Sequence, residues 1–303
     1  MKVLITTSSF GQIDSAPLIK LKRSGYQVIL NPYGRKLNEE EVAGLIQEHQ
    51  PVAMVAGVEP LTSSVIQKAA PWLRVISRCG TGLESVDLEA AERMGISVTN
   101  TPDATTVPVA ELTLGLILAV LRGLHISDRS IRENRWERPM GSLLCGKTVG
   151  IIGCGRIGRH LAKNLYVLGC RVLGFDLTCP DCNHIEFIEL EVLLKDADIV
   201  TLHLPSSEAN HNFMNEDRIQ TMKKGSYLIN AARGNLIDEE ALYDALESGH
   251  LAGAALDTFK QEPYRGPLKD LNNVLLTAHI GSYAREARVM MEKEAVDKLL
   301  EFL

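Results

Sequence analysis

The sequence predicts an α/β protein with two domains, each built on a doubly wound parallel sheet. Three observations lead to this fold class: short apolar runs recur along the chain, amphipathic segments separate them, and the runs are continuous rather than alternating. Continuous apolar runs are typical of parallel strands that helices cover on both faces. The 303 residues also exceed one domain of about 100–200 residues, so we expect two.

The N-terminal third contains the first series of strands and helices. The expected strands are residues 3–7, 27–30, 52–56, 73–77 and 96–98. Apolar side chains at helical spacing mark the helices between them as residues 39–49, 62–70 and 87–94. This alternation predicts a small doubly wound unit.

A second series of the same kind begins after residue 147. Its expected strands are residues 148–152, 171–175, 199–204, 227–230, 253–256 and 274–277. Its expected helices are residues 156–168, 190–195, 238–248 and 284–302. We expect the last of these helices to return to the first domain.

Residues 101–136 separate the two series and have the character of long helical sequence, with Pro108 near the start. We interpret this segment as the connection between the domains, together with an arm that packs on another subunit.

The composition excludes several classes of partner. Lys and Arg number 32 and Asp and Glu number 38, a net charge of −6 without any basic block. Nucleic acid and lipid surfaces are therefore disfavoured as partners. The apolar stretch at residues 1–5 is too short for a signal peptide, and residues 112–121 are too short and interrupted to span a bilayer. We expect a cytoplasmic protein.

Six scattered cysteines favour a reducing compartment. Cys179 and Cys182 have the spacing of a metal-ligand pair, with His184 close by. A structural zinc site normally needs a second pair, which the neighbouring sequence lacks. We therefore interpret this segment as an exposed loop and predict no metal site.

The strongest chemical motif is the pattern Gly-x-Gly-x-x-Gly at residues 153–158, directly after an expected strand and at the start of an expected helix. This context predicts the dinucleotide-binding turn of a Rossmann domain. Gly153 permits the tight turn, Gly155 lets a pyrophosphate approach the backbone, and Gly158 lets helix and strand pack closely. The phosphates would bind to free N–H groups at the helix N-terminus.

Asp176 ends the next expected strand, 18 residues after Gly158. A carboxylate at this place accepts hydrogen bonds from the ribose hydroxyls. No Arg follows through Cys182, so a 2′-phosphate would meet an uncompensated negative charge. The sequence therefore favours NAD over NADP.

Three ionisable residues, Arg233, Glu262 and His279, follow three strands of the second series. Each alone is also typical of a structural or solvated residue, but together they lie where open α/β sheets bind ligands. Reduction of a keto group needs a proton donor near neutrality, which suits His279. A neighbouring carboxylate, Glu262, would fix the imidazole tautomer, and Arg233 would bind a substrate carboxylate and polarise the adjacent carbonyl.

These motifs, in this order and spacing, resemble the D-isomer-specific 2-hydroxyacid dehydrogenase family along essentially the whole chain, and most of all its branch that acts on 3-phosphoglycerate. The segments that carry the resemblance are residues 78–82, 86–87, 100–102, 109–112, 136–138, 146–148, 153–158, 203–205, 230–234, 257–259, 262–263 and 279–281.

The resemblance implies a role for each matching residue. His279 would be the acid/base, Glu262 its partner and Arg233 the substrate-binding guanidinium. The substrate carboxylate would bind at a loop formed by Arg78, Gly80, Thr81 and Gly82. Residues implied to contact NAD are Thr106, Gly153, Gly155, Arg156, Ile157, Gly158, Asp176, His203, Pro205, Ala231 and Asp257.

The resemblance also implies a domain plan. Residues 1–99 and 282–303 would form a flavodoxin-like substrate domain, and residues 100–281 a Rossmann cofactor domain whose helical arm makes a homodimer. The chain stops just after the returning helix, so we expect no regulatory extension.

One turn departs from the pattern of the phosphoglycerate enzymes. They commonly carry an Arg-rich turn after the third strand, where this chain has Glu59 within residues 57–62. A substrate phosphate beside Glu59 would be repelled unless Arg78, Arg35 or Lys36 compensates.

Alternatives to 3-phosphoglycerate therefore remain. One is a reductase for glyoxylate, hydroxypyruvate or another small 2-keto acid. Another is an NADH-sensing transcriptional corepressor, which the three retained catalytic residues argue against. Formate dehydrogenases of the superfamily carry Gln where this chain has Glu262, so that branch is disfavoured.

Overall fold

The computed structural model describes residues 1–178 and 182–303, which divide into two units. The first comprises Met1–Thr105 and Ser282–Leu303, and the second comprises Thr106–Gly281. The sequence had assigned residues 100–105 to the second domain. The structure groups them with the first unit, because the Thr101 N–H donates to the Gly80 carbonyl and the Ala104 N–H donates to Glu294 Oε2.

The first unit contains a five-stranded sheet in which every pairing is parallel, in the order β2-β1-β3-β4-β5. Its strands are β1 (Lys2–Ile5), β2 (Gln27–Leu30), β3 (Ala53–Ala56), β4 (Val75–Arg78) and β5 (Ser97–Asn100). This order is the flavodoxin-like one, as the sequence predicts.

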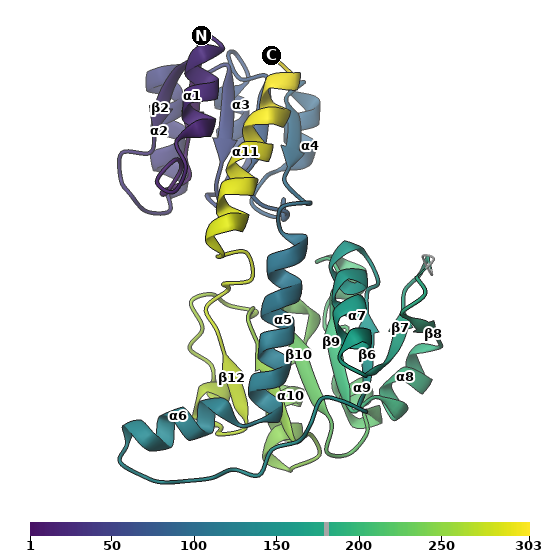
Figure 1. Cartoon of the computed structure of the whole chain (residues 1–303). Coiled ribbons are helices and arrows are strands. Elements are labelled where there is room, and N and C mark those ends of the chain that lie inside the picture. Colours follow the sequence, from purple (N-terminus) through teal and green to yellow (C-terminus); the bar gives the residue numbers. More distant parts are fainter. Residues whose placement is uncertain (179–181) are drawn as a thin grey trace. The chain divides into compact units, whose positions relative to one another are not determined.

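Helices cover both faces of the first sheet (Figure 1). They are α1 (Ala16–Arg23), α2 (Glu39–His49), α3 (Ser63–Ala69), α4 (Leu88–Arg93) and α11 (Arg285–Glu301). Alternate side chains of β1 separate between the faces: Leu4 packs in the core under α2, α3 and α4, whereas Val3 and Ile5 pack under α1 and α11. Burial on both faces explains the continuous apolar runs.

The second unit contains a seven-stranded parallel sheet in the order β12-β11-β10-β9-β6-β7-β8. Its strands are β6 (Thr148–Ile152), β7 (Arg171–Phe175), β8 (Glu186–Phe187), β9 (Ile199–Leu202), β10 (Tyr227–Asn230), β11 (Gly253–Leu256) and β12 (Val274–Leu276). The chain order reverses between β6 and β9, as in a Rossmann domain. The fold class predicted from the sequence is confirmed.

The helices of the second unit also form two layers. On one face lie α5 (Thr106–Leu121) and α7 (Arg156–Val167), and on the other α8 (Leu190–Asp196), α9 (Glu216–Thr221) and α10 (Glu239–Glu247). Short 3₁₀ turns are η1 (Glu208–Asn210), η2 (Gly234–Leu236) and η3 (Pro267–Asp270).

The long helical segment expected over residues 101–136 is broken. Helix α5 ends at Leu121, Gly123 adopts a left-handed conformation with φ of 58°, and α6 (Leu124–Arg132) continues at 66° to α5. Glycine takes this conformation at little steric cost, so the chain turns there. Expectation and structure also differ at α1, α9 and the two-residue β8, which the sequence analysis did not predict.

Among the described residues, no single helix has the length and hydropathy of a membrane span, although the bent pair of α5 and α6 meets both criteria when counted together. In α5, the apolar side chains of Ile117 and Leu121 are buried in the second unit.

Candidate active site

The predicted catalytic residues and most of the predicted cofactor-binding residues follow the carboxyl ends of strands in the second sheet. Ligands of open α/β sheets bind outside these ends, at the point where the chain order reverses. In this sheet the point lies between β6, which leads into the turn at Gly153, and β9, which leads into His203. The turn and His203 are in contact.

The turn after β6 has the shape that a bound dinucleotide requires. Gly153 has φ of 95°, and a Cβ there would stand 2.7 Å from the His203 carbonyl carbon. A Cβ on Gly155 would meet nothing within 4 Å, so the space over that backbone is open. Because Gly155 is the N-cap of α7, no side chain of its own covers the first turn of that helix. A pyrophosphate fits there.

Asp176 closes one side of this turn. Its Oδ2 accepts a hydrogen bond of 2.7 Å from the Cys154 N–H, and its Oδ1 accepts bonds of 3.0 Å from the N–H and the hydroxyl of Thr178. Partial burial works against ionisation, but the hydrogen bonds from Thr178 and Cys154 lower the pKa of Asp176 below its ordinary value. An ionised carboxylate suits ribose hydroxyls and repels a 2′-phosphate.

His203 is held as a neutral ring. Its Nε2 lies 3.1 Å from the Thr201 hydroxyl, and its Nδ1 is shielded from solvent with no hydrogen-bond partner among the described residues. Burial lowers the pKa of His203 to about 4. An enclosed nitrogen beside the glycine turn is available to a bound group, so these residues fit a dinucleotide.

The other residues implied to contact the cofactor vary in exposure. Thr106 is the first residue of α5, Ala231 and Gly158 are buried, Ile157 is partly buried, and Arg156 and Pro205 are exposed.

Arg233 lies in a turn that Asn230 holds. Asn230 is buried at the end of β10; its Nδ2 donates to the Arg233 carbonyl over 2.8 Å, and its Oδ1 accepts from the Ala232 N–H over 3.0 Å. Arg233 is partly buried and extended, and its Nη1 donates to the Ala232 carbonyl over 2.8 Å. The turn therefore fixes the backbone from which the guanidinium extends.

Gly234 brings this turn against the loop that carries Glu262. A Cβ on Gly234 would collide with the backbone of Phe259 and Lys260. The Phe259 N–H donates to Glu262 Oε1 over 3.2 Å, and the Lys260 N–H donates to Glu239 Oε1 over 2.8 Å. Close backbone packing and these two bonds position the Glu262 carboxylate.

The structure brings Glu262 and His279 together. Glu262 Oε2 and His279 Nδ1 are 2.9 Å apart, and the side chains are 39% and 49% exposed. Because the other carboxylate oxygen accepts a hydrogen bond from the Phe259 N–H, both oxygens of Glu262 are engaged. A bond at Nδ1 leaves Nε2 for another group.

Asp257 has a task that the sequence analysis missed. This fully buried carboxylate accepts hydrogen bonds from the Thr277 hydroxyl and from the N–H groups of Ile280 and Gly281, over 2.6–2.9 Å. It thereby anchors both sides of His279, whose φ of 53° is unusual for a residue other than glycine. In the sequence, the signal for this role is an acidic residue directly after a predicted buried strand. Its contact with nicotinamide stays a prediction.

In the first unit, the loop of Gly80, Thr81 and Gly82 is tied to the segment after β5. The Gly80 N–H donates to Thr101 Oγ1 over 2.8 Å, the Thr81 carbonyl accepts from Asn100 Nδ2 over 2.7 Å, and the Arg78 guanidinium donates to the Cys79 carbonyl. The predicted carboxylate site therefore relies on the N–H groups of Thr81 and Gly82 rather than on Gly80.

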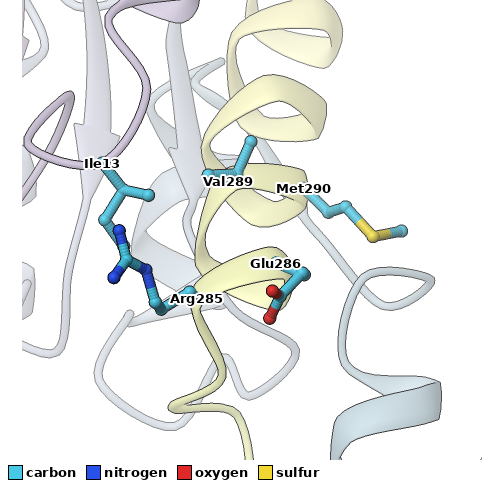
Figure 2. A pocket seen from close by; sticks show the side chains of 5 residues that line it. All are labelled: Ile13, Arg285, Glu286, Val289 and Met290. Atoms are coloured by element: carbon cyan, nitrogen blue, oxygen red, sulfur yellow. The ribbon is translucent and has the colours of Figure 1, made fainter.

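Two further features lie apart from these residues. A pocket of about 340 Å³ lies in the first unit. It is lined by Ile13, Arg285, Glu286, Val289 and Met290 (Figure 2), none of which is a predicted site residue. Within residues 1–178 and 182–303, no three His, Cys, Asp or Glu side chains gather as metal ligands. Cys179 lies outside the described residues, so the interpretation of this segment as an exposed loop without a metal site stays a prediction.

Comparison with known proteins identifies the family. Residues 114–281 match the family model described as the D-isomer specific 2-hydroxyacid dehydrogenase, NAD binding domain. The chain belongs to the D-isomer-specific 2-hydroxyacid dehydrogenases. As a member of this family it is an oxidoreductase that binds NAD, so the predictions of family and cofactor are both confirmed.

Relatives within the family differ in their named substrates. The chain is 37% identical to a hydroxypyruvate reductase of Thermotoga maritima over 274 residues, which are 88% of this chain and 89% of that protein. It is 39% identical to a D-3-phosphoglycerate dehydrogenase of Methanocaldococcus jannaschii over 260 residues, 83% of this chain and 49% of that protein. The chain thus spans about half the length of the second relative.

Among solved structures, the TT0316 protein of Thermus thermophilus has a TM-score of 0.91 and 38% identity to this 2-hydroxyacid dehydrogenase, covering 99% of this chain and 96% of that one. The match over both units confirms the fold.

Proposed function

We propose that this dehydrogenase interconverts a small 2-keto acid and the corresponding D-2-hydroxy acid, with Arg233, Glu262 and His279 as its catalytic residues. The observation that carries the proposal is the 2.9 Å contact between His279 Nδ1 and Glu262 Oε2. A ring nitrogen oriented by a carboxylate is the arrangement expected of a general acid/base.

The cofactor would be held by the turn at residues 153–158, by Asp176 and by the segment at His203. When bound, NADH supplies the hydride that C2 of the keto acid gains, and NAD⁺ accepts it in the reverse direction. Ala231, Asp257 and Thr106 would lie toward its nicotinamide end.

His279 transfers the proton. In the reductive direction Nε2 gives its proton to the oxygen on C2, and Glu262 stabilises the ring while it is charged. Solvent then returns a proton to the ring. In the oxidative direction the neutral ring takes the hydroxyl proton. General acid/base catalysis of this kind contributes about 10²–10⁴-fold in rate.

Arg233 binds the substrate carboxylate. The guanidinium forms charge-assisted hydrogen bonds to the carboxylate and polarises the adjacent carbonyl. In the first unit, the N–H groups of Thr81 and Gly82, with the charge of Arg78, are suited to a carboxylate.

The candidate substrates are 3-phosphoglycerate and the smaller acids related to glyoxylate and hydroxypyruvate. Relatives named for both kinds of activity support both candidates.

We also propose a cytoplasmic homodimer. Large apolar side chains are exposed on α6 and the segment that follows it, including Leu124 at 56%, Trp136 at 80% and Met140 at 98%. A second copy that packed on this arm would cover them. Solution scattering tests the assembly, and a monomer at micromolar concentration would contradict it.

The activity is tested with purified protein, NADH and a panel of pyruvate, glyoxylate, hydroxypyruvate and 3-phosphohydroxypyruvate. We expect oxidation of NADH with at least one of them, together with formation of the corresponding hydroxy acid, in the D configuration where C2 is a stereocentre. No oxidation across the panel, with NADH binding intact, would overturn the proposed function.

A further inference from the structure

Two cysteines lie at the amino ends of the neighbouring strands β6 and β7. Cys145 is exposed and comes three residues before β6, whereas Cys170 is 6% exposed and directly precedes β7. The two strands are paired and parallel (Figure 1). The glycine turn and Asp176 follow the opposite, carboxyl ends of the same strands, so neither thiol belongs to the candidate active site.

Main-chain hydrogen bonds hold the two cysteine-bearing segments side by side. The Gly146 N–H donates to the Gly169 carbonyl over 3.0 Å. The Arg171 N–H donates to the Lys147 carbonyl, also over 3.0 Å. Neighbouring strands bonded in this way lie about 4.7–4.9 Å apart. A disulfide requires about 4.4–6.8 Å between its two Cα atoms, so the spacing of these segments suits one.

Each sulfur atom contacts the residue next to the other cysteine. The Cys170 thiol donates a hydrogen bond of 3.6 Å to the Leu144 carbonyl, which belongs to the peptide group that leads into Cys145. The Cys145 sulfur lies over Gly169, where a Cβ would stand 3.0 Å from it. Gly169 has φ of 82°, a conformation that favours glycine, and the missing side chain leaves room for the sulfur. The two thiols are therefore neighbours in space.

The two thiols differ in reactivity. Burial, and to a smaller extent the neighbouring Cys145, raises the pKa of the Cys170 thiol to about 11. Since the thiolate is the reactive form of cysteine, Cys170 is a poor first nucleophile. Cys145 is exposed and can meet a dissolved oxidant. One accessible thiol beside one buried thiol is the arrangement expected of an attacking and a resolving cysteine.

We propose that Cys145 and Cys170 form a redox modification site, which a small oxidising disulfide such as oxidised glutathione converts into an intramolecular disulfide. In the first step the Cys145 thiolate attacks one sulfur of oxidised glutathione, so a mixed disulfide forms and one glutathione leaves. In the second step the Cys170 thiol loses its proton and attacks the Cys145 sulfur, which releases the second glutathione. The protein loses two electrons and two protons, and the two released glutathiones gain them.

The disulfide would join the starting points of β6 and β7 and close the loop that contains β6, the glycine turn and α7. Closing a loop restricts the unfolded chain, so the oxidised protein should be the more stable form. We expect its Tm to exceed that of the reduced protein by about 5 °C. Disulfides that form and break in a reducing compartment are typical of redox sensing.

Peptide mapping of the full chain tests the site. Purified, reduced protein is incubated with oxidised glutathione, its remaining thiols are blocked, and it is digested with trypsin without reductant. We expect a product that joins residues 136–147 to residues 164–171 and that dithiothreitol removes. Absence of this product after prolonged incubation, or its presence only in a covalent dimer on non-reducing electrophoresis, would overturn the proposal.

Three variants test the order of the steps. Cys170→Ala removes the resolving thiol, so Cys145 should retain one glutathione. Cys145→Ser removes the attacking thiol, so Cys170 should stay unmodified. Cys182→Ser is the control, because Cys182 is a partly exposed cysteine of the same unit, and it should leave the link unchanged. Glutathione on Cys170 in the Cys145 variant, or none on Cys145 in the Cys170 variant, would contradict the assigned roles.

A measurement on the unmodified protein covers the case in which Cys170→Ala does not fold. Thermal melting is compared between protein oxidised as above and the same sample after dithiothreitol, and NADH binding reports that both forms are folded. A higher Tm in the oxidised form, absent from Cys145→Ser, supports a bridge that the fold accommodates. A lower Tm would show that the link distorts the fold, and it would contradict the proposal.

Discussion

The two sheets have the same kind of reversal point, yet the residues at these points differ in charge. In the second unit the loop after β6 is glycine-rich and open, and it leads into α7, whose N-terminus attracts an anion. In the first unit the loop after β3 contributes the buried Glu59, whose Oε1 accepts a hydrogen bond from the Gly57 N–H. The same topology thus places an anion-attracting helix N-terminus in one unit and a buried carboxylate in the other.

The largest expected effect on kcat comes from the proposed acid/base, and it tests whether residues at the strand ends of the second unit catalyse the reaction. His279→Ala should lower kcat by about 10²–10⁴-fold, because the proton donor is lost. His211→Ala removes an exposed imidazole of the same unit and should leave kcat unchanged. Steady-state rates with NADH and the best keto acid give the comparison, and a His279 variant with ordinary turnover would remove this residue from its role.

A steric change tests how tightly the second unit positions its acid/base pair. Gly234→Ala places a methyl group against the Phe259 backbone, so the loop that carries Glu262 must move. Misplacement of about 1 Å costs about 10²-fold in rate. We expect kcat to fall by that order while the Kd for NADH, measured by fluorescence, changes little. Full activity would show that the loop tolerates the displacement.

A smaller effect concerns charge at the edge of the glycine turn. Asp176→Ala removes the acceptor for the ribose hydroxyls and the repulsion of a 2′-phosphate, so KM for NADH should rise about tenfold and the preference for NADH over NADPH should fall. Asp217→Ala, at an exposed acid of the same unit, serves as control. A stronger preference for NADH in the Asp176 variant would contradict the assignment.

The smallest effect is on stability. Because burial lowers the pKa of His203 from 6.5 to about 4, the unfolded chain binds a proton that the folded chain does not between these values. The free energy of unfolding should therefore fall as pH decreases from 6.5 to about 4, by about 1–3 kcal/mol from this group. Denaturant titrations of His203→Gln should show a shallower pH dependence than the unmodified protein, and identical slopes would contradict the shift.

Much of this organisation was predictable, because buried parallel strands leave continuous apolar runs that single-sequence reasoning detects. Strand β8 was not predicted because Glu186 and Phe187 form no such run. The break at Gly123 was not predicted because apolar residues occur on both sides of it. Among the site residues, the sequence predicted that Glu262 lies beside His279, because both residues follow strands of the second series. The three hydrogen bonds of Asp257 and the bond from Gly80 to Thr101 depend on tertiary geometry between distant segments, which no local pattern encodes.

The division of the chain has a consequence for its synthesis. Residues 106–281 are inserted between β5 and α11 of the first unit, and the buried Ala295, Val296 and Leu299 of α11 cover one face of the first sheet. A ribosome translates the whole second unit before α11. The first sheet is translated earlier, but one of its faces stays partly uncovered until α11 has been made. The cofactor unit can therefore begin to fold before the first unit is complete.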